Sequence, residues 1–305
     1  MTQTDEGVLD PWVAEWIAAN AAMMEQPEEY TPEYLAAART PTCPFPTYPV
    51  AKVTDDIVDG VPVRIYEHDQ TPNGLILYFH GGGFCTGSIG LMENIATGLA
   101  HHAGAAVVSV GYRLTPEHPY PAGLDDCETV TRWAITNAAR FGASPDTVTV
   151  AGESAGGNLS AAVALRLRDS GGPALTGQVL IYPAVASPTA NFPSQTEFSG
   201  PMLRFEGVEK VWAMYSGGRN IDHDPYAAPL EAEDLGGLPP ALIVLGGCDV
   251  LRDEGRQYGL RLRDAGVKVD EAGFAGQPHG FMNLGFPAAE LAHQRIGEWL
   301  RALVA

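Results

Sequence analysis

From about residue 60 onward, short apolar runs alternate with longer amphipathic stretches, and this alternation constrains the fold more than any other feature of the chain. Buried strands of a parallel sheet appear in a sequence as continuous apolar runs of this kind. The strand-like runs are VRIYEH (63–68), LILYF (75–79), AAVVSV (105–110), TVTVAG (147–152), QVLIYP (178–183), ALIVLGG (241–247) and VKVDEAGF (267–274). The helix-like segments are 92–103, 125–139, 154–168, 252–265 and 288–303. The sequence therefore predicts an α/β fold with a mostly parallel central sheet.

Two further expectations concern the order of the elements. The runs at 63–68 and 75–79 follow each other without a helix, so we expect them to begin the sheet as an antiparallel pair. Residues 10–39 and 186–217 do not fit the alternation. The first region predicts two short helices, because Asp10-Pro11 and Thr31-Pro32 each place a capping residue before a proline. We expect 1–50 and 186–217 to form a helical cap over a catalytic domain made of 51–185 and 218–305.

Composition excludes several classes of partner. The formal charge of −19 and the pI near 4.6 argue against nucleic acids and anionic membranes as partners, since both are bound by basic patches. No run approaches the roughly 18 apolar residues of a membrane span, and the first residues do not resemble a signal peptide. We expect a cytoplasmic protein. The widely spaced cysteines and the His and Asp clusters at 101–102 and 222–224 predict no metal site.

The segment GESAG, residues 152–156, lies between a predicted strand and a predicted helix. A serine in a GxSxG motif at this kind of turn is typical of a nucleophile whose hydroxyl is exposed at the edge of the sheet. Small residues two positions before and after the serine are needed for the sharp turn. Ser154 is therefore the candidate nucleophile.

Three consecutive glycines follow the apolar run at 75–79, in HGGGF at 80–84. Glycines in a row are costly to order, and they mark a place where backbone approaches another group closely. The backbone N–H groups of such a loop can bind the oxyanion that forms during acyl transfer. The loop lacks the Lys-Ser/Thr ending of a phosphate-binding P-loop and the spacing of GxGxxG.

Together these segments resemble the hormone-sensitive-lipase-like family (bacterial esterase family IV) of α/β-hydrolase carboxylesterases. The matching stretches are HGGGF (80–84), YRLTPEHPYPAGLDD (112–126), GESAGGNL (152–159), DVLRDEG (249–255) and HGF (279–281). The resemblance implies an α/β-hydrolase fold with a cap, and a serine esterase that needs no cofactor. It implies Ser154 as nucleophile, Asp249 as acid and His279 as base, with Gly82, Gly83 and Ala155 as oxyanion-hole donors.

The order of the residues along the chain favours the same assignment. α/β-Hydrolases place the nucleophile first, the acid second and the histidine third. Beyond the candidate acids lie His279, in a predicted loop, and His293, inside a predicted helix where packing is the more natural role. Asp249 follows a predicted strand, and Asp253 is the alternative acid one helical turn later.

Two departures from the family pattern leave the subgroup open. The residue before the nucleophile is Glu153, where the family usually has Asp or Thr, and Val250 follows the acid where proline is common. Cys85 and Cys248 adjoin the motifs, so bulky thiol modification is expected to inhibit, unless both are simply small buried residues.

The substrate is predicted from the cap and from the resemblance. Five aromatic residues are candidates for an apolar roof over the substrate, or alternatively for contacts between cap helices: Trp12, Trp16, Phe205, Trp212 and Tyr215. The resemblance implies hydrolysis of short- to medium-chain carboxylic esters, and a homodimer through the last strand and last helix. Lactones, amides and a catalytically silent binding protein are the alternatives.

Overall fold

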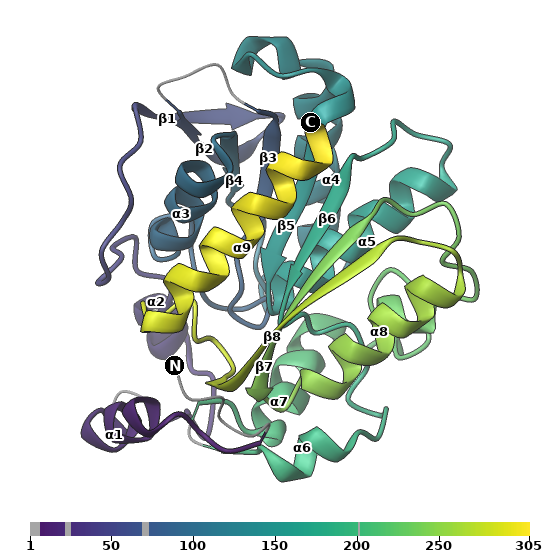
Figure 1. The fold of residues 1–305 in the computed structure, drawn as a ribbon. Coiled ribbons are helices and arrows are strands. Elements are labelled where there is room, and N and C mark those ends of the chain that lie inside the picture. The colour runs from purple at the N-terminus through teal and green to yellow at the C-terminus, as the bar shows by residue number, and fades with distance from the viewer. Residues whose placement is uncertain (1–6, 22–25, 69–72, 201) are drawn as a thin grey trace.

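The computed structural model describes residues 7–21, 26–68, 73–200 and 202–305, so parts of the predicted cap, at 1–6, 22–25 and 201, lie outside the described residues. A sheet of eight strands runs through the molecule in the order β1-β2-β4-β3-β5-β6-β7-β8 (Figure 1). The strands are β1 (Lys52–Val58), β2 (Val61–Glu67), β3 (Leu75–Phe79), β4 (Ala106–Val110), β5 (Val148–Glu153), β6 (Gly177–Ile181), β7 (Ala241–Cys248) and β8 (Val269–Pro278).

Six consecutive strands of the sheet, from β4 to β8, pair in parallel, as predicted. The predicted antiparallel pair of β2 and β3 is wrong. β2 pairs antiparallel with β1 on one side and with β4 on the other, and β3 lies between β4 and β5. The chain between β2 and β3 therefore crosses β4 before it re-enters the sheet, which a local hydrophobic pattern does not reveal.

Helices cover both faces of the sheet. α3 (Glu93–Ala103) and α9 (Pro287–Val304) lie on one face, and α4 (Ala122–Thr136), α5 (Ala155–Asp169) and α8 (Arg252–Asp264) lie on the other. Alternation along β3 divides its side chains between two cores, with Leu75 and Leu77 in one and Ile76 and Tyr78 in the other. The five predicted helical segments are thus confirmed, as is the α/β-hydrolase type of sheet. Short 3₁₀ turns occupy Ala138–Phe141, Pro145–Thr147 and Pro229–Glu231.

Four more helices gather at the end of the sheet toward which β7 and β8 point (Figure 1). They are α1 (Pro11–Ala19), α2 (Pro32–Ala38), α6 (Pro193–Glu197) and α7 (Phe205–Ser216). The predicted starts of the first two are confirmed. The side chain of Asp10 accepts a hydrogen bond from the N–H of Trp12 at 2.9 Å, and that of Thr31 accepts one from the N–H of Tyr34 at 3.2 Å.

Arg39, the residue after α2, attaches that helix to the body of the protein. Its guanidinium donates to the carbonyl oxygen of Cys85 at 2.8 Å, to that of Thr115 at 2.9 Å and to the Glu117 carboxylate at 2.9 Å. A planar group with several donors suits this convergence of acceptors from separate loops. The position of α2 is therefore fixed by residues that follow it by 46 or more positions.

None of the helices in the described ranges has the length and the apolar character that crossing a membrane requires.

Candidate active site

Ser154 lies at the sharp turn between β5 and α5. Its backbone has φ +57° and ψ −119°, a conformation that a residue with a side chain rarely adopts. The neighbouring glycines are required by space, since a Cβ at Gly152 would overlap the carbonyl of Gly156, and one at Gly156 would overlap that of Phe79. The strained turn projects the serine side chain from the edge of the sheet, as the motif predicts.

The strand ends bring two further side chains to this serine. Asp249 follows β7 and His279 follows β8, and these strands are parallel neighbours. The Nε2 atom of His279 lies 3.0 Å from the Oγ atom of Ser154, and its Nδ1 atom lies 2.9 Å from an Oδ2 oxygen of Asp249. An ionised carboxylate only accepts hydrogen bonds, so Nδ1 carries the proton toward Asp249 and Nε2 is left to accept from the serine. The three predicted residues thus form one hydrogen-bonded series.

Asp249 is held by more than the histidine. The carboxylate is fully buried, and its Oδ1 oxygen accepts a hydrogen bond from the backbone N–H of Leu251 at 2.8 Å. A buried charge requires such partners. One oxygen is therefore fixed by the backbone, which directs the other toward His279.

The alternative residues lie elsewhere. The Asp253 carboxylate accepts from the N–H of Ser194 and from Arg252, at 2.9 and 2.8 Å. His293 is buried in α9 beside Tyr48, and burial lowers its pKa to about 3. Neither side chain contacts Ser154, so the structure does not bring them into the series.

The glycine loop, residues 80–84, lines the same cavity as Ser154. Gly82 and Gly83 have φ of +111° and +59°. A Cβ at Gly82 would collide with the carbonyl of Thr86, and one at Gly83 would press on Val211 of α7. Within the described part of the chain, no hydrogen bond uses the N–H groups of Gly82, Gly83 or Ala155. Three backbone donors beside the serine are thus left available.

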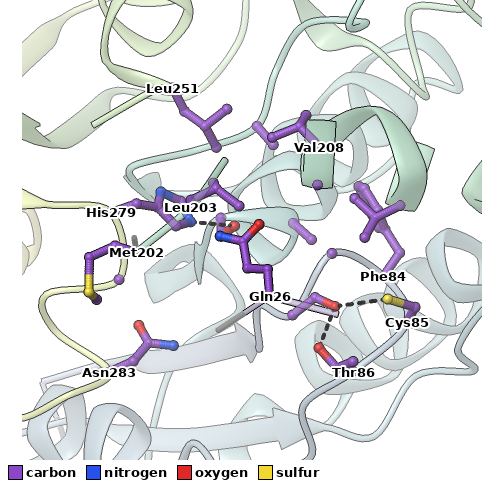
Figure 2. A pocket seen from close by; sticks show the side chains of 18 of the residues that line it. Gln26, Phe84, Cys85, Thr86, Met202, Leu203, Val208, Leu251, His279 and Asn283 are labelled. Carbon is purple, nitrogen blue, oxygen red and sulfur yellow. Dashed lines mark hydrogen bonds between the residues drawn. The ribbon is translucent and has the colours of Figure 1, made fainter. Parts of the chain in front are cut away.

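A cavity of about 340 Å³ opens above these groups, with His279 on one side and Phe84 and Cys85 on the other (Figure 2). Its walls are mostly apolar. The aromatic and larger aliphatic side chains in the lining are Tyr30, Tyr34, Phe84, Met92, Tyr182, Met202, Leu203, Val208, Val211, Trp212, Leu251 and Leu284. Apolar walls with few polar groups are typical of small-molecule sites.

Only one of the five predicted roof residues, Trp212, lies in this lining. Trp12 and Trp16 instead pack edge-on against Phe286, with ring centroids 5.4 and 5.0 Å away. Tyr215 is buried behind the wall, and Phe205 lies at the first turn of α7, outside the lining. These four residues therefore lie outside the lining of this cavity. The contacts of Trp12 and Trp16 with Phe286, and of Tyr215 with Phe84, also differ from the predicted alternative of contacts between cap helices.

Sequence reasoning missed Tyr30 and Tyr34, two aromatic residues of the wall. Their rings make an edge-on pair with centroids 5.6 Å apart. The signal was present, since both lie beside the well-marked start of α2 at Thr31. What the sequence does not give is the rotation of that helix toward the cavity.

Several side chains in or beside the motifs lie outside the reacting groups. His80 is buried under the glycine loop, its Nδ1 atom 2.7 Å from the carbonyl oxygen of Gly81, and burial lowers its pKa to about 4. Cys85 and Cys248 are both buried, and the four cysteines, all of which lie in the described ranges, are free thiols. Among the described residues, no three His, Cys, Asp or Glu side chains are arranged to hold a metal ion.

Comparison with known proteins identifies the family to which this architecture belongs. The model of the family described as alpha/beta hydrolase fold matches residues 76–283. Carboxylesterase NlhH of Mycobacterium tuberculosis is 38% identical over 298 residues, which cover 94% of this chain and 89% of that protein. Esterase LipI of the same organism is 39% identical over 263 residues, which cover 82% of each chain.

Solved structures of esterases have the same fold as this chain. A hyperthermophilic esterase from the archaeon Pyrobaculum calidifontis superimposes with a TM-score of 0.88 at 32% identity, covering 98% of this chain and 100% of its own. A structure titled DphMB1 superimposes with a TM-score of 0.87 at 36% identity, covering 97% and 99%. The chain therefore belongs to the α/β-hydrolase fold family, in its hormone-sensitive-lipase-like branch.

Proposed function

We propose that the protein is a serine carboxylesterase that hydrolyses short- to medium-chain carboxylic esters through an acyl-enzyme intermediate. One observation carries the proposal: the Oγ atom of Ser154 lies 3.0 Å from His279, whose other nitrogen lies 2.9 Å from Asp249. A nucleophile, a base and a group that orients the base are the parts needed for acyl transfer. Relatives named carboxylesterase and esterase support the same reaction.

In the first half of the reaction, His279 removes the proton of Ser154 as Oγ attacks the ester carbonyl. Asp249 keeps Nδ1 protonated and stabilises the imidazolium that results. The tetrahedral intermediate then collapses. Its C–O bond to the alcohol breaks, and the proton on Nε2 of His279 passes to the departing oxygen. Water, activated by the same histidine, hydrolyses the acyl-enzyme and restores the serine.

The oxyanion of each tetrahedral intermediate is assigned to the N–H groups of Gly82, Gly83 and Ala155. Donors that are already in place and unpaired need no rearrangement when the charge forms. Losing one such donor typically reduces kcat by about 10²–10³-fold. The positive φ values of the two glycines support this assignment, because they turn successive N–H groups in directions that other residues reach only with strain.

Substrate size is assigned to a cap formed by the segments 1–50 and 186–217, over a catalytic domain of 51–185 and 218–305. Residues of both cap segments that the structure describes, Tyr30, Tyr34, Leu203 and Trp212 among them, contribute to the cavity wall. A volume of about 340 Å³ suits a short or medium acyl chain.

Hydrolysis of p-nitrophenyl butyrate, octanoate and palmitate by the wild type and by Ser154→Ala tests the proposal. We expect turnover of the shorter esters, little of palmitate, and none above background in the variant. Equal activity of the variant would show that another group reacts. An inactive wild type would overturn the assignment to these esters.

A further inference from the structure

Glu153, the residue before the nucleophile, occupies a position that the proposed reaction does not use. Its side chain is fully buried at the end of β5. One carboxyl oxygen accepts a hydrogen bond from the backbone N–H of Gly81 at 2.6 Å, and the other accepts one from the hydroxyl of Tyr78 at 2.7 Å. Burying a carboxyl group is unfavourable unless both oxygens are satisfied in this way. Each oxygen of the Glu153 carboxyl group thus has its own hydrogen-bond donor.

The bond to Gly81 fixes the start of the oxyanion loop. Gly81 directly precedes Gly82 and Gly83, whose N–H groups remain unpaired within the described residues. A Cβ at Gly81 would lie 2.8 Å from the carbonyl oxygen of Glu153 and 3.0 Å from its carboxyl group, so the loop and Glu153 are in close contact. A shift of the Gly81 peptide would therefore turn the two donors that follow it.

A second bond completes the hold on the loop. The hydroxyl of Tyr112 donates to the carbonyl oxygen of His80 at 2.6 Å, so the peptide between His80 and Gly81 is fixed at both its oxygen and its N–H. The Tyr112 bond restrains the carbonyl end, and Glu153 restrains the N–H end. Because Glu153 is also the neighbour of Ser154, it joins the loop that binds the oxyanion to the turn that carries the nucleophile.

A carboxyl group suits this place better than an amide. Two donors converge on Glu153, one for each oxygen, whereas glutamine offers one acceptor oxygen and an NH₂ group. In Glu153→Gln the oxygen can still accept from Gly81, but the hydroxyl of Tyr78 then loses its acceptor. The substitution keeps the volume, changes this hydrogen-bond pattern and removes the ionisable group.

We propose that Glu153 is a positioning residue of the oxyanion hole: its carboxyl group holds Gly81 so that the N–H groups of Gly82 and Gly83 point at the oxygen of the reacting carbonyl. The inference rests on the proposed esterase function. Its effect belongs to the transition state, because the loop donors act on the oxygen as charge develops there. Glu153 therefore raises kcat and leaves the binding of the uncharged ester nearly unchanged.

The test compares the wild type with Glu153→Gln and Glu153→Ala, using p-nitrophenyl butyrate and two ketones of the same length. A trifluoromethyl ketone adds to Ser154 as a hemiketal whose oxygen occupies the oxyanion hole, and the matching methyl ketone reports binding without that charge. For Glu153→Ala we expect kcat to fall about a hundredfold, as for one lost donor, with KM little changed. In the same variant, the affinity for the trifluoromethyl ketone falls by the same factor, whereas the affinity for the methyl ketone is unchanged. For Glu153→Gln we expect values of kcat and of trifluoromethyl ketone affinity between those of the wild type and Glu153→Ala.

Glu254→Gln is the matched control for the removal of a buried carboxyl group. Glu254 is also buried, but its carboxyl group accepts from the N–H of Ala186 at 3.2 Å instead of from the glycine loop. We expect this variant to keep the wild-type ratio of the two ketone affinities. Thermal unfolding shows whether each variant is folded at the assay temperature, and if Glu153→Ala is not, Glu153→Gln supplies the comparison.

Two results would overturn the inference. One is a folded Glu153 variant with wild-type kcat and wild-type trifluoromethyl ketone affinity. The other is an equal loss of affinity for both ketones, which indicates a general disturbance of the cavity. The proposed function fails separately, through a wild type that neither hydrolyses the ester nor forms the hemiketal.

Discussion

The rings of Phe84 and Tyr215 stack with their centroids 3.7 Å apart and their planes inclined by 9°. Phe84 follows the three glycines, and Tyr215 belongs to α7. Two hydrogen bonds support the contact, from the hydroxyl of Thr115 to the carbonyl of Met214 and from the N–H of Tyr120 to the carbonyl of Tyr215. The glycine loop is therefore supported by α7 on one side and by Glu153 on the other.

Removing the Tyr215 ring is expected to loosen this support. Tyr215 is 2% exposed, and truncating a buried aromatic side chain typically costs about 3–5 kcal/mol of stability. For Tyr215→Ala we expect a loss of this size in the free energy of unfolding, together with a lower kcat. Denaturant unfolding and ester turnover measure the two effects.

Tyr215→Phe separates the ring from the hydroxyl. Among the described residues, the buried Tyr215 hydroxyl has no hydrogen-bond partner. Its removal should therefore leave stability unchanged or raise it, and keep kcat at the wild-type value. A loss in Tyr215→Phe as large as that in Tyr215→Ala would contradict a role for ring stacking.

Asp249→Asn is expected to lower kcat by about 10⁴-fold, by comparison with the same change in a serine protease. The amide can donate to Nδ1 of His279, which would place the proton on Nε2, the wrong atom for accepting from Ser154. Asp253→Asn is the matched control, four residues along the same chain and held by Ser194 and Arg252. If Asp253→Asn lost as much activity, the assignment of the acid would have to be reversed.

Glu254 makes stability depend on pH in a direction opposite to that of a salt-bridged acid. Burial raises its pKa from 4.5 to about 8, so between these values the folded state binds a proton that the unfolded state has released. The contribution of Glu254 to the free energy of unfolding is therefore fully present below pH 4.5 and is lost as the pH rises toward 8.

Glu254→Gln removes this dependence. Relative to the wild type, the variant should gain on the order of 4 kcal/mol in unfolding free energy between pH 5 and pH 8. Denaturant titrations of both proteins at the two pH values measure the difference. An identical pH dependence in the two proteins would show that Glu254 does not titrate in this range.

Thiol reagents provide a test of the cysteines beside the motifs. Burial raises the pKa of Cys85 to about 12 and also raises that of Cys248, so little reactive thiolate forms at neutral pH. We expect iodoacetamide to modify the partly exposed Cys43 first, and esterase activity to persist. Mass spectrometry and activity assays of the same samples check this. Rapid labelling of Cys85 with loss of activity would support inhibition by thiol modification instead.

The sequence predicts the parts of this fold that depend on local pattern. The buried strands are continuous apolar runs, and the capped helix starts at Asp10 and Thr31 have side-chain bonds that the residue types imply. β1 was not predicted, because its KVTDDIV segment is largely exposed at the edge of the sheet and lacks an apolar run. The position of β3 beyond β4 depends on long-range pairing, which no local pattern encodes.

In the candidate site, too, some features follow from local sequence pattern and others depend on long-range packing. Ser154, Asp249 and His279 each follow a strand, so a chain with parallel strands brings them to one edge. The cavity wall depends instead on how short helices dock. Trp12 and Trp16 are larger and more apolar than Tyr30 and Tyr34, yet the tyrosines line the cavity and the tryptophans cover Phe286. Docking geometry, rather than residue type, decides which aromatic side chain meets a substrate.

The contacts of Arg39 have a consequence for the order in which the molecule is assembled. During synthesis, α2 leaves the ribosome before Cys85, Thr115 and Glu117, the residues that hold Arg39 in place. The backbone carbonyl of Gln26 is likewise made before its partner Arg204, whose guanidinium donates a hydrogen bond to it at 3.1 Å. Contacts between residues far apart in sequence form late in folding. α2 is thus made before the residues that hold it in place, and the cavity wall beside Ser154 forms only after the chain as far as Arg204 has been made.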